Sequence, residues 1–166
     1  MTAAGTTAFD GLGMNISIES HSPAETQAVG RCLARVLHAG DIVGLEGDLG
    51  SGKTVLVQGL AAGLGVTARV HSPTFVLHHR YPGPVPLEHY DLYRLGALDW
   101  HDAGLDEPAP GSITVIEWAE RGAPLRDWAT VRIQLQSVSE QVRRLTCLKG
   151  AERVEECFRS NADPGH

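Results

Sequence analysis

Long hydrophobic runs are absent from this 166-residue chain. None approaches the roughly 20 apolar residues that a membrane-spanning helix needs, and the opening MTAAGTTAFDG has neither the charged start nor the hydrophobic stretch of a signal peptide. Cysteine is scarce. Cys32, Cys147 and Cys157 are odd in number and lack CxxC spacing, which predicts neither a disulfide framework nor a zinc ribbon. These absences predict a protein of the reducing cytoplasm that makes no membrane contact.

Basic residues are also few. Lysine and arginine total 14 against 20 acidic residues, which gives a formal net charge of −6. Proteins that bind nucleic acid directly usually carry a basic stripe, so the charge disfavours a chain that wraps a polyanion. Only two of the basic residues, Lys53 and Lys149, are lysines. The position of Lys53 is therefore informative.

The apolar pattern predicts one domain in which strands and helices alternate, and the 42% hydrophobic content is ordinary for a globular protein. Strands are predicted at 14–20, 41–46 and 113–118, as a pair on either side of the turn YPGP, and as a hairpin at 131–136 and 142–148. A first helix should begin at the capping box Ser22–Glu25 and end at Gly40. A second should end by Gly65, although Gly59 and Gly63 within it should cost roughly 1 kcal/mol each.

The segment between the strand at 41–46 and the second helix matches the phosphate-binding pattern GxxxxGK[ST], or Walker A. Its residues are Gly47, Asp48, Leu49, Gly50, Ser51, Gly52, Lys53 and Thr54. Glycines let the backbone fold around phosphate oxygens, the lysine bridges the β- and γ-phosphates, and the hydroxyl of Thr54 is placed to ligate Mg²⁺. Since neither lysine lies in the NKxD signature of GTPases, we expect ATP rather than GTP.

A P-loop enzyme also needs a carboxylate near its magnesium ion. Two acids compete for that role: Glu117 at the end of the apolar strand 113–116, and Asp91 in HYDLYRL. Thr74 in SPTF lies where P-loop switches often place a hydroxyl over the γ-phosphate, although it could equally satisfy the turn at Pro73. Trp118 could stack on a base, but a half-buried indole at a strand end is more common.

The eight histidines do not form a convincing metal site. His78 and His79 are adjacent on a predicted strand, so their side chains should point to opposite faces. No cysteine lies close enough in the sequence to complete a zinc set.

Four motifs occur in a fixed order: GDLGSGKT, SPTF at 72–75, HYDLYRL at 89–95 and the pair Glu117–Trp118. Over about residues 14–148 the chain resembles the TsaE family. The resemblance implies a small ATPase that supports bacterial synthesis of threonylcarbamoyladenosine next to the tRNA anticodon. It would bind the TsaB–TsaD pair, hydrolyse ATP to reset that pair, be slow on its own, and meet tRNA only through its partners.

The resemblance also implies site residues. Lys53 and the loop amides match the phosphate cradle, Thr54 the magnesium ligand, and Thr74 the first switch threonine. Asp91 and Glu117 look like the acids at the metal and the γ-phosphate, so the implied catalytic set is Lys53, Thr74, Asp91 and Glu117. Trp118, Val55 and Arg144 would lie near the nucleotide. Ser51 and Val55 depart from the residues usual in the family, and the poorly matching segment 96–110 could face a partner.

The expected fold is a single-domain α/β, P-loop NTPase-like three-layer sandwich with a mixed, mostly parallel sheet. We expect a disordered extension at 1–13, the P-loop ATPase domain at 14–150, and a short helix with a frayed tail at 151–166. Two other functions stay open at this point. A small-molecule P-loop kinase would share the phosphate cradle, but the segment 96–112 lacks the arginines of a kinase lid. A nucleotide-gated binding module would use Asp91 and Glu117 only structurally.

Overall fold

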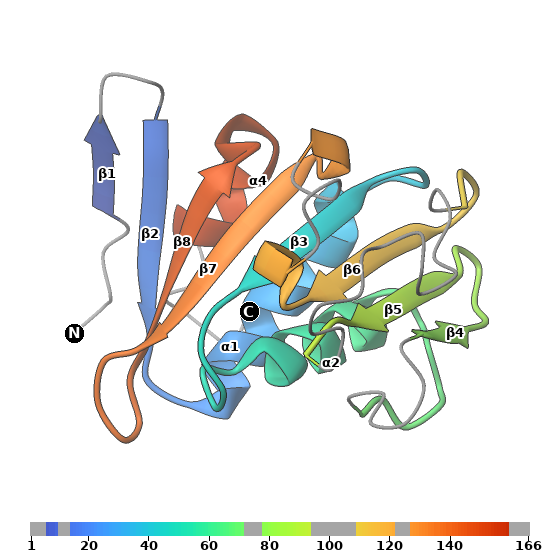
Figure 1. Ribbon diagram of the computed structural model, residues 1–166, viewed down its shortest axis with the longest axis horizontal. Helices are drawn as coiled ribbons and strands as arrows, with labels where there is room; N and C mark the ends of the chain where they lie inside the picture. Colours follow the sequence, from blue (N-terminus) through green and yellow to red (C-terminus); the bar gives the residue numbers. More distant parts are fainter. Residues whose placement is uncertain (1–5, 10–13, 72–77, 94–108, 122–126, 160–166) are drawn as a thin grey trace.

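The structure, a computed structural model, describes residues 6–9, 14–71, 78–93, 109–121 and 127–159. The elements in chain order are β1 (Thr6–Phe9), β2 (Met14–Ser20), α1 (Pro23–Val36), β3 (Ile42–Glu46), α2 (Lys53–Gly63), β4 (His78–Tyr81), β5 (Leu87–Asp91), β6 (Ile113–Glu117), the 3₁₀ turn η1 (Ala119–Arg121), β7 (Val131–Ser137), β8 (Arg143–Lys149) and α4 (Ala151–Arg159). Figure 1 shows one twisted sheet with these α-helices gathered behind it. No helix in the described ranges is long and apolar enough to cross a membrane.

The eight strands form one sheet in the order β1-β2-β8-β7-β3-β6-β5-β4. Parallel pairing is confined to the four central strands β7, β3, β6 and β5. The other four pairings are antiparallel. The single α/β domain and the mixed sheet are confirmed. The sheet is less parallel than expected, because the hairpins β4–β5 and β7–β8 attach antiparallel strands on both sides of the centre.

The main core lies between the sheet and the helices. Fully buried side chains of α1, α2 and α4 pack there against the central strands, among them Leu33, Leu56 and Phe158. A smaller cluster on the opposite face joins Tyr90 and Ile116 to η1. Of the two helical layers expected in a three-layer sandwich, the described residues show the one formed by α1, α2 and α4.

The predicted start of α1 is confirmed. The Ser22 hydroxyl accepts a hydrogen bond from the backbone N–H of Glu25 at 3.1 Å, and the Glu25 carboxylate accepts one from the N–H of His21 at 2.6 Å. Pro23 occupies the first turn, where a missing N–H costs nothing. The cap fixes the place where the chain leaves β2 and turns behind the sheet.

The glycines that seemed to weaken α2 let it approach α1. A Cβ built on Gly59 would lie 2.6 Å from the Cα of Gln27 in α1, and one on Gly63 would lie 3.1 Å from the Cα of Arg31. On the other helix, a Cβ on Gly30 would lie 2.6 Å from the backbone N of Leu60. Glycine therefore sets the distance between the two helices, and its propensity cost is offset by the packing that the close crossing permits.

The expectation of no disulfide is wrong. Cys32 of α1 and Cys157 of α4, 125 residues apart, form a disulfide bond. Cys147 is a buried free thiol, and burial raises its pKa to about 12. The bond escaped the sequence analysis because the two cysteines meet only through the packing of α4 on α1, which no local spacing reveals.

Both ends of the chain add more structure than expected. Thr6–Phe9 form β1, which pairs with β2, although residues 1–13 were expected to be disordered. The predicted C-terminal helix is present as α4, and its Val154 and Phe158 are fully buried in the main core. Arg153 of α4 also makes an ion pair with the buried Asp41, which precedes β3. Helix α4 is therefore an integral part of the domain.

Replacing Gly59 with alanine tests the helix crossing. The change should destabilise the protein by about 3 kcal/mol, because a methyl group would overlap the backbone of α1 and outweigh a gain of about 1 kcal/mol in helix propensity. Urea unfolding followed by circular dichroism measures the effect. Ala62→Gly, at an exposed position of the same helix, is the control and should lose only about 1 kcal/mol. A stabilised Gly59→Ala protein would contradict the close approach.

The disulfide should add about 4–5 kcal/mol to the free energy of unfolding, because it closes a loop of 125 residues in the unfolded chain. Urea unfolding of the oxidised protein, with and without a thiol reductant, measures this contribution. The double variant Cys32→Ser, Cys157→Ser should unfold at the same urea concentration in both conditions. Equal midpoints for the wild-type protein in the two conditions would show that the bond contributes nothing.

Candidate functional site

The glycine-rich loop joins the carboxyl end of β3, a central strand, to the first residue of α2. Gly47, Gly50 and Gly52 have φ angles of 144°, 79° and 102°, which side-chain-bearing residues rarely adopt. A Cβ on Gly50 would meet nothing within 4 Å, and one on Gly52 would meet only side-chain atoms at 3.8 Å or more. The loop thus has the backbone that its sequence predicts, with open space in front of its second and third glycines.

Lys53 begins α2 and folds back over this loop. Its Nζ donates hydrogen bonds to the carbonyl oxygens of Gly47 at 2.6 Å and Asp48 at 2.9 Å, and to the hydroxyl of Ser51 at 3.3 Å. Burial lowers the pKa of Lys53, an effect that nearby carboxylates, led by Glu117, reduce but do not cancel. The side chain is a buried cation held above the loop by backbone oxygens.

Thr54 and Glu117 connect α2 to the sheet. The Thr54 hydroxyl donates to the Glu117 carboxylate, with distances of 2.9 Å to Oε1 and 3.1 Å to Oε2. Glu117 ends β6, the parallel neighbour of β3, and only 2% of its surface is exposed. The structure therefore brings together two of the residues that the sequence placed at the metal.

Asp91 and Trp118 lie beside this pair. Asp91 ends β5 in register with Glu117, is 8% exposed, and accepts a hydrogen bond from the N–H of Tyr93 at 2.9 Å. Trp118 has a φ of 60°, the only positive φ among the described non-glycine residues, and its ring lies 4.1 Å from the Nζ of Lys53. A bulky residue in the left-handed region is strained, and such strain clusters at functional sites.

Sequence reasoning missed two contacts made by η1. The Glu120 carboxylate accepts a hydrogen bond from the N–H of Gly47 at 3.1 Å. Arg121 lies over the rings of Tyr93 and Trp118 and donates to the carbonyl oxygen of Tyr93. The turn that follows Glu117 is thereby packed directly against the glycine-rich loop. Its proximity in sequence to Glu117 was the only available signal.

His89 was not among the predicted site residues, because histidines were considered only as metal ligands. Its imidazole is fully buried, and its Nε2 lies 2.6 Å from Oε2 of Glu117. His78 and His79 point to different surroundings, as predicted: His78 contacts Glu88, whereas His79 lies near His71 and Tyr81. In the described part of the chain, no three histidine, cysteine or acidic side chains cluster closely enough to hold a metal ion.

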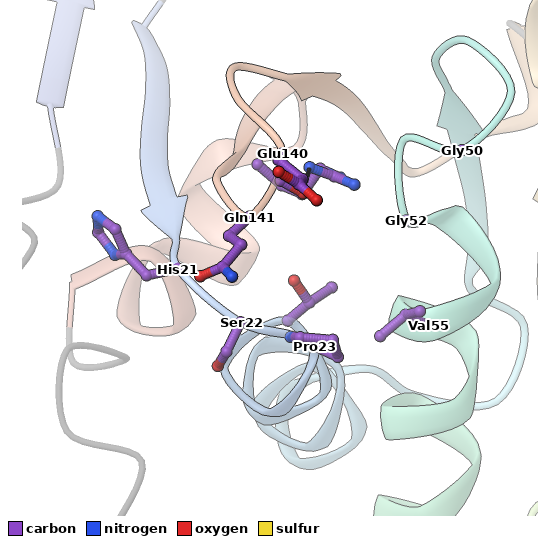
Figure 2. A pocket seen from close by; sticks show the side chains of 10 residues that line it. His21, Ser22, Pro23, Gly50, Gly52, Val55, Glu140 and Gln141 are labelled. Atoms are coloured by element: carbon purple, nitrogen blue, oxygen red, sulfur yellow. Dashed lines mark hydrogen bonds between the residues drawn. The ribbon is translucent and has the colours of Figure 1, made fainter.

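A cavity of about 490 Å³ opens next to the glycine-rich loop. Figure 2 shows it between the start of α1, the start of α2 and the turn that joins β7 to β8. Its lining residues are His21, Ser22, Pro23, Thr26, Gly50, Gly52, Val55, Glu140, Gln141 and Arg143. The cavity adjoins Gly52 and Val55, whereas the neighbouring Thr54 turns its hydroxyl to Glu117. It is a candidate site for the rest of any ligand whose phosphates lie on the loop.

One predicted site residue, Arg144, lies apart from this arrangement. Arg144 forms an ion pair with Glu19 of β2 at 3.0 Å, while the preceding residue, Arg143, lines the cavity. Neighbouring residues of a strand point to opposite faces, so the structure favours Arg143 at this position. Thr74 lies outside the described residues. Of the remaining loop residues, Leu49 is 75% exposed and Ser51 is buried.

Taken together, the fold and the site define a single-domain α/β protein with a glycine-rich loop between a central parallel strand and a helix, and a buried acid on the adjacent strand. The family model described as "Threonylcarbamoyl adenosine biosynthesis protein TsaE" matches residues 20–145. The chain therefore belongs to the TsaE family, whose members carry a name that refers to tRNA threonylcarbamoyladenosine biosynthesis.

Individual relatives agree with this family. The chain is 41% identical over 129 residues to the Treponema pallidum "tRNA threonylcarbamoyladenosine biosynthesis protein TsaE", covering 76% of this chain and 96% of the relative. Identity to the Bacillus subtilis protein of the same description is 36% over 136 residues, covering 81% and 85% of the two chains. The crystal structure of Bacillus subtilis YdiB matches with a TM-score of 0.65 at 28% identity, covering 92% of this chain and 93% of that one.

Proposed function

We propose that this protein is a magnesium-dependent ATPase that serves tRNA threonylcarbamoyladenosine formation by binding the TsaB–TsaD pair and resetting it through ATP hydrolysis. The observation that carries the proposal is the hydrogen bond between Thr54, directly after the loop lysine, and the buried Glu117. It puts a hydroxyl and a carboxylate, two oxygen ligands suited to Mg²⁺, at the start of the helix that follows a glycine-rich loop.

The residues present fit a nucleotide with its metal ion. Lys53 would exchange its bonds to the carbonyl oxygens of Gly47 and Asp48 for oxygens of the β- and γ-phosphates, so its charge would neutralise them. Thr54 and an acid, Glu117 or Asp91, would hold Mg²⁺, which when bound neutralises charge that develops on the phosphates. The other acid would orient the attacking water, and Trp118 would cover Lys53 from solvent.

The cavity beside Val55 is where we place the nucleoside. Thr54 directs its hydroxyl toward Glu117, which marks the γ-phosphate side, so the base should leave the loop on the opposite side, past Gly52 and Val55. Glu140 and Gln141 supply polar groups that suit hydrogen bonds with a base, and Arg143 adds a positive charge near the phosphates. The cavity is thus large enough and suitably lined for adenosine.

The remaining parts of the proposal follow from charge and family membership. A net charge of −6 suits a protein that meets tRNA through partners rather than directly. Partners that act in the same modification pathway are expected for a member of the TsaE family. We place the protein in the cytoplasm, where tRNA is modified, on the ground of this pathway and not of its cysteines, because the buried Cys32–Cys157 bond is of a kind rare in that compartment.

Partner-stimulated turnover tests this function. The purified protein should release phosphate from ATP slowly alone and at least tenfold faster with TsaB and TsaD, because the partners would stabilise the hydrolytic arrangement. A phosphate-release assay with Mg²⁺ measures both rates. Equal rates with and without the partners would contradict the proposal, and transfer of phosphate to an acceptor other than water would indicate a kinase instead.

Neutral isosteres of the two acids test the site. Glu117→Gln and Asp91→Asn should keep the affinity for nucleotide measured without Mg²⁺ within about threefold and lower the stimulated hydrolysis rate at least 100-fold, because each removes a charge needed in the transition state. Titration calorimetry and the phosphate-release assay give the two quantities. Glu155→Gln on α4, which removes an acid that pairs with Arg159 away from the candidate site, is the matched control and should leave both unchanged. Unchanged turnover in the first two variants would remove the roles proposed for both acids.

A further inference from the structure

His89 has an arrangement that simple core packing does not explain. Its side chain lies on β5 with 0% exposure, and its Nδ1 has no hydrogen-bond partner among the described residues. An unpaired buried nitrogen destabilises the fold relative to an apolar side chain of similar size. The other ring nitrogen makes the one bond that offsets this cost, the 2.6 Å contact to Glu117.

The direction of that bond follows from its chemistry. An ionised carboxylate only accepts hydrogen bonds, so Nε2 of His89 carries the hydrogen and donates it to Oε2 of Glu117. Thr54 donates to the same carboxylate at 2.9 Å from Oε1. The carboxylate is therefore held from two sides, by an imidazole of β5 and by a hydroxyl of α2.

The strand register explains why a histidine at this position reaches Glu117. His89 pairs with Val115 in the parallel ladder of β5 and β6, and Glu117 follows two residues later on the same face. The imidazole spans this diagonal separation. Without it, Oε2 of Glu117 would lose its shorter contact and keep the 3.1 Å one to Thr54, and the carboxylate could rotate about that hydroxyl.

We propose that His89 is a positioning residue, which fixes the carboxylate of Glu117 against the Thr54 hydroxyl, the orientation in which that carboxylate would serve a magnesium ion or the attacking water. This role rests on the proposed ATPase function. Because its ring is fully buried, His89 itself would touch neither nucleotide nor metal. Its contribution passes through the orientation of Glu117, so its loss should lower turnover more than nucleotide affinity.

Two substitutions separate positioning from packing. His89→Leu removes the donor and keeps an apolar side chain in the core, whereas His89→Gln keeps an N–H donor at a similar distance from the backbone. We expect His89→Leu to lower the partner-stimulated kcat at least tenfold, with the dissociation constant for nucleotide measured without Mg²⁺ changed less than threefold. His89→Gln should recover most of that loss. His79→Leu, which removes the neighbouring imidazole on the same face, should behave as wild type.

The turnover of the wild-type protein tests the proposed function. The ratio of variant to wild-type turnover tests the role of His89. If the wild type binds the nucleotide but does not hydrolyse it, the readout is the gain in affinity that Mg²⁺ gives a slowly hydrolysed ATP analogue. That gain in affinity should then be at least tenfold smaller in His89→Leu than in the wild type, and unchanged in His89→Gln. Equal losses in the Leu and Gln variants, or no loss in either, would overturn the positioning role. A wild-type protein that binds no nucleotide would overturn both proposals.

Discussion

The hydrogen bond from Thr54 to Glu117 joins the first turn of α2 to the end of β6, and the candidate site is built around this junction. It exists because β3 and β6 are parallel neighbours, with Leu45 opposite Glu117, so the loop after β3 starts level with the end of β6. The positive φ angles of the loop glycines then turn the chain so that α2 begins beneath that end. A buried carboxylate loses its solvation, and the hydrogen bonds from Thr54 and His89 offset that loss for Glu117.

Local signals predicted the parts of this structure that neighbouring residues determine. The capping box at Ser22, the glycine-rich turn before Lys53 and the apolar strand that ends at Glu117 depend on residues a few positions apart, and each lies where the sequence placed it. The common edge at which Glu117 and Asp91 lie also follows from parallel strand order. The central sheet and the core of the candidate site were therefore readable from the sequence.

Features that depend on distant residues could not be read in the same way. The bond between Cys32 and Cys157 needs the position of α4 on α1, and His89 needs the register of β5 against β6. The choice between Arg143 and Arg144 depends on which strand face borders the cavity. Gly59 was expected to weaken α2, because its low helix propensity is a local property. Its small size matters only in the contact with α1, which local sequence does not reveal.

The close crossing of α1 and α2 also limits how the cavity can change its width. Two of its walls are the first turns of these helices, and backbone contact through Gly30 and Gly59 leaves the helices no room to slide past each other. The two helix starts therefore form one fixed wall of the cavity. The opposite wall is the β7–β8 turn that carries Glu140 and Gln141, so a ligand of different size would be accommodated by movement of that turn (Figure 2).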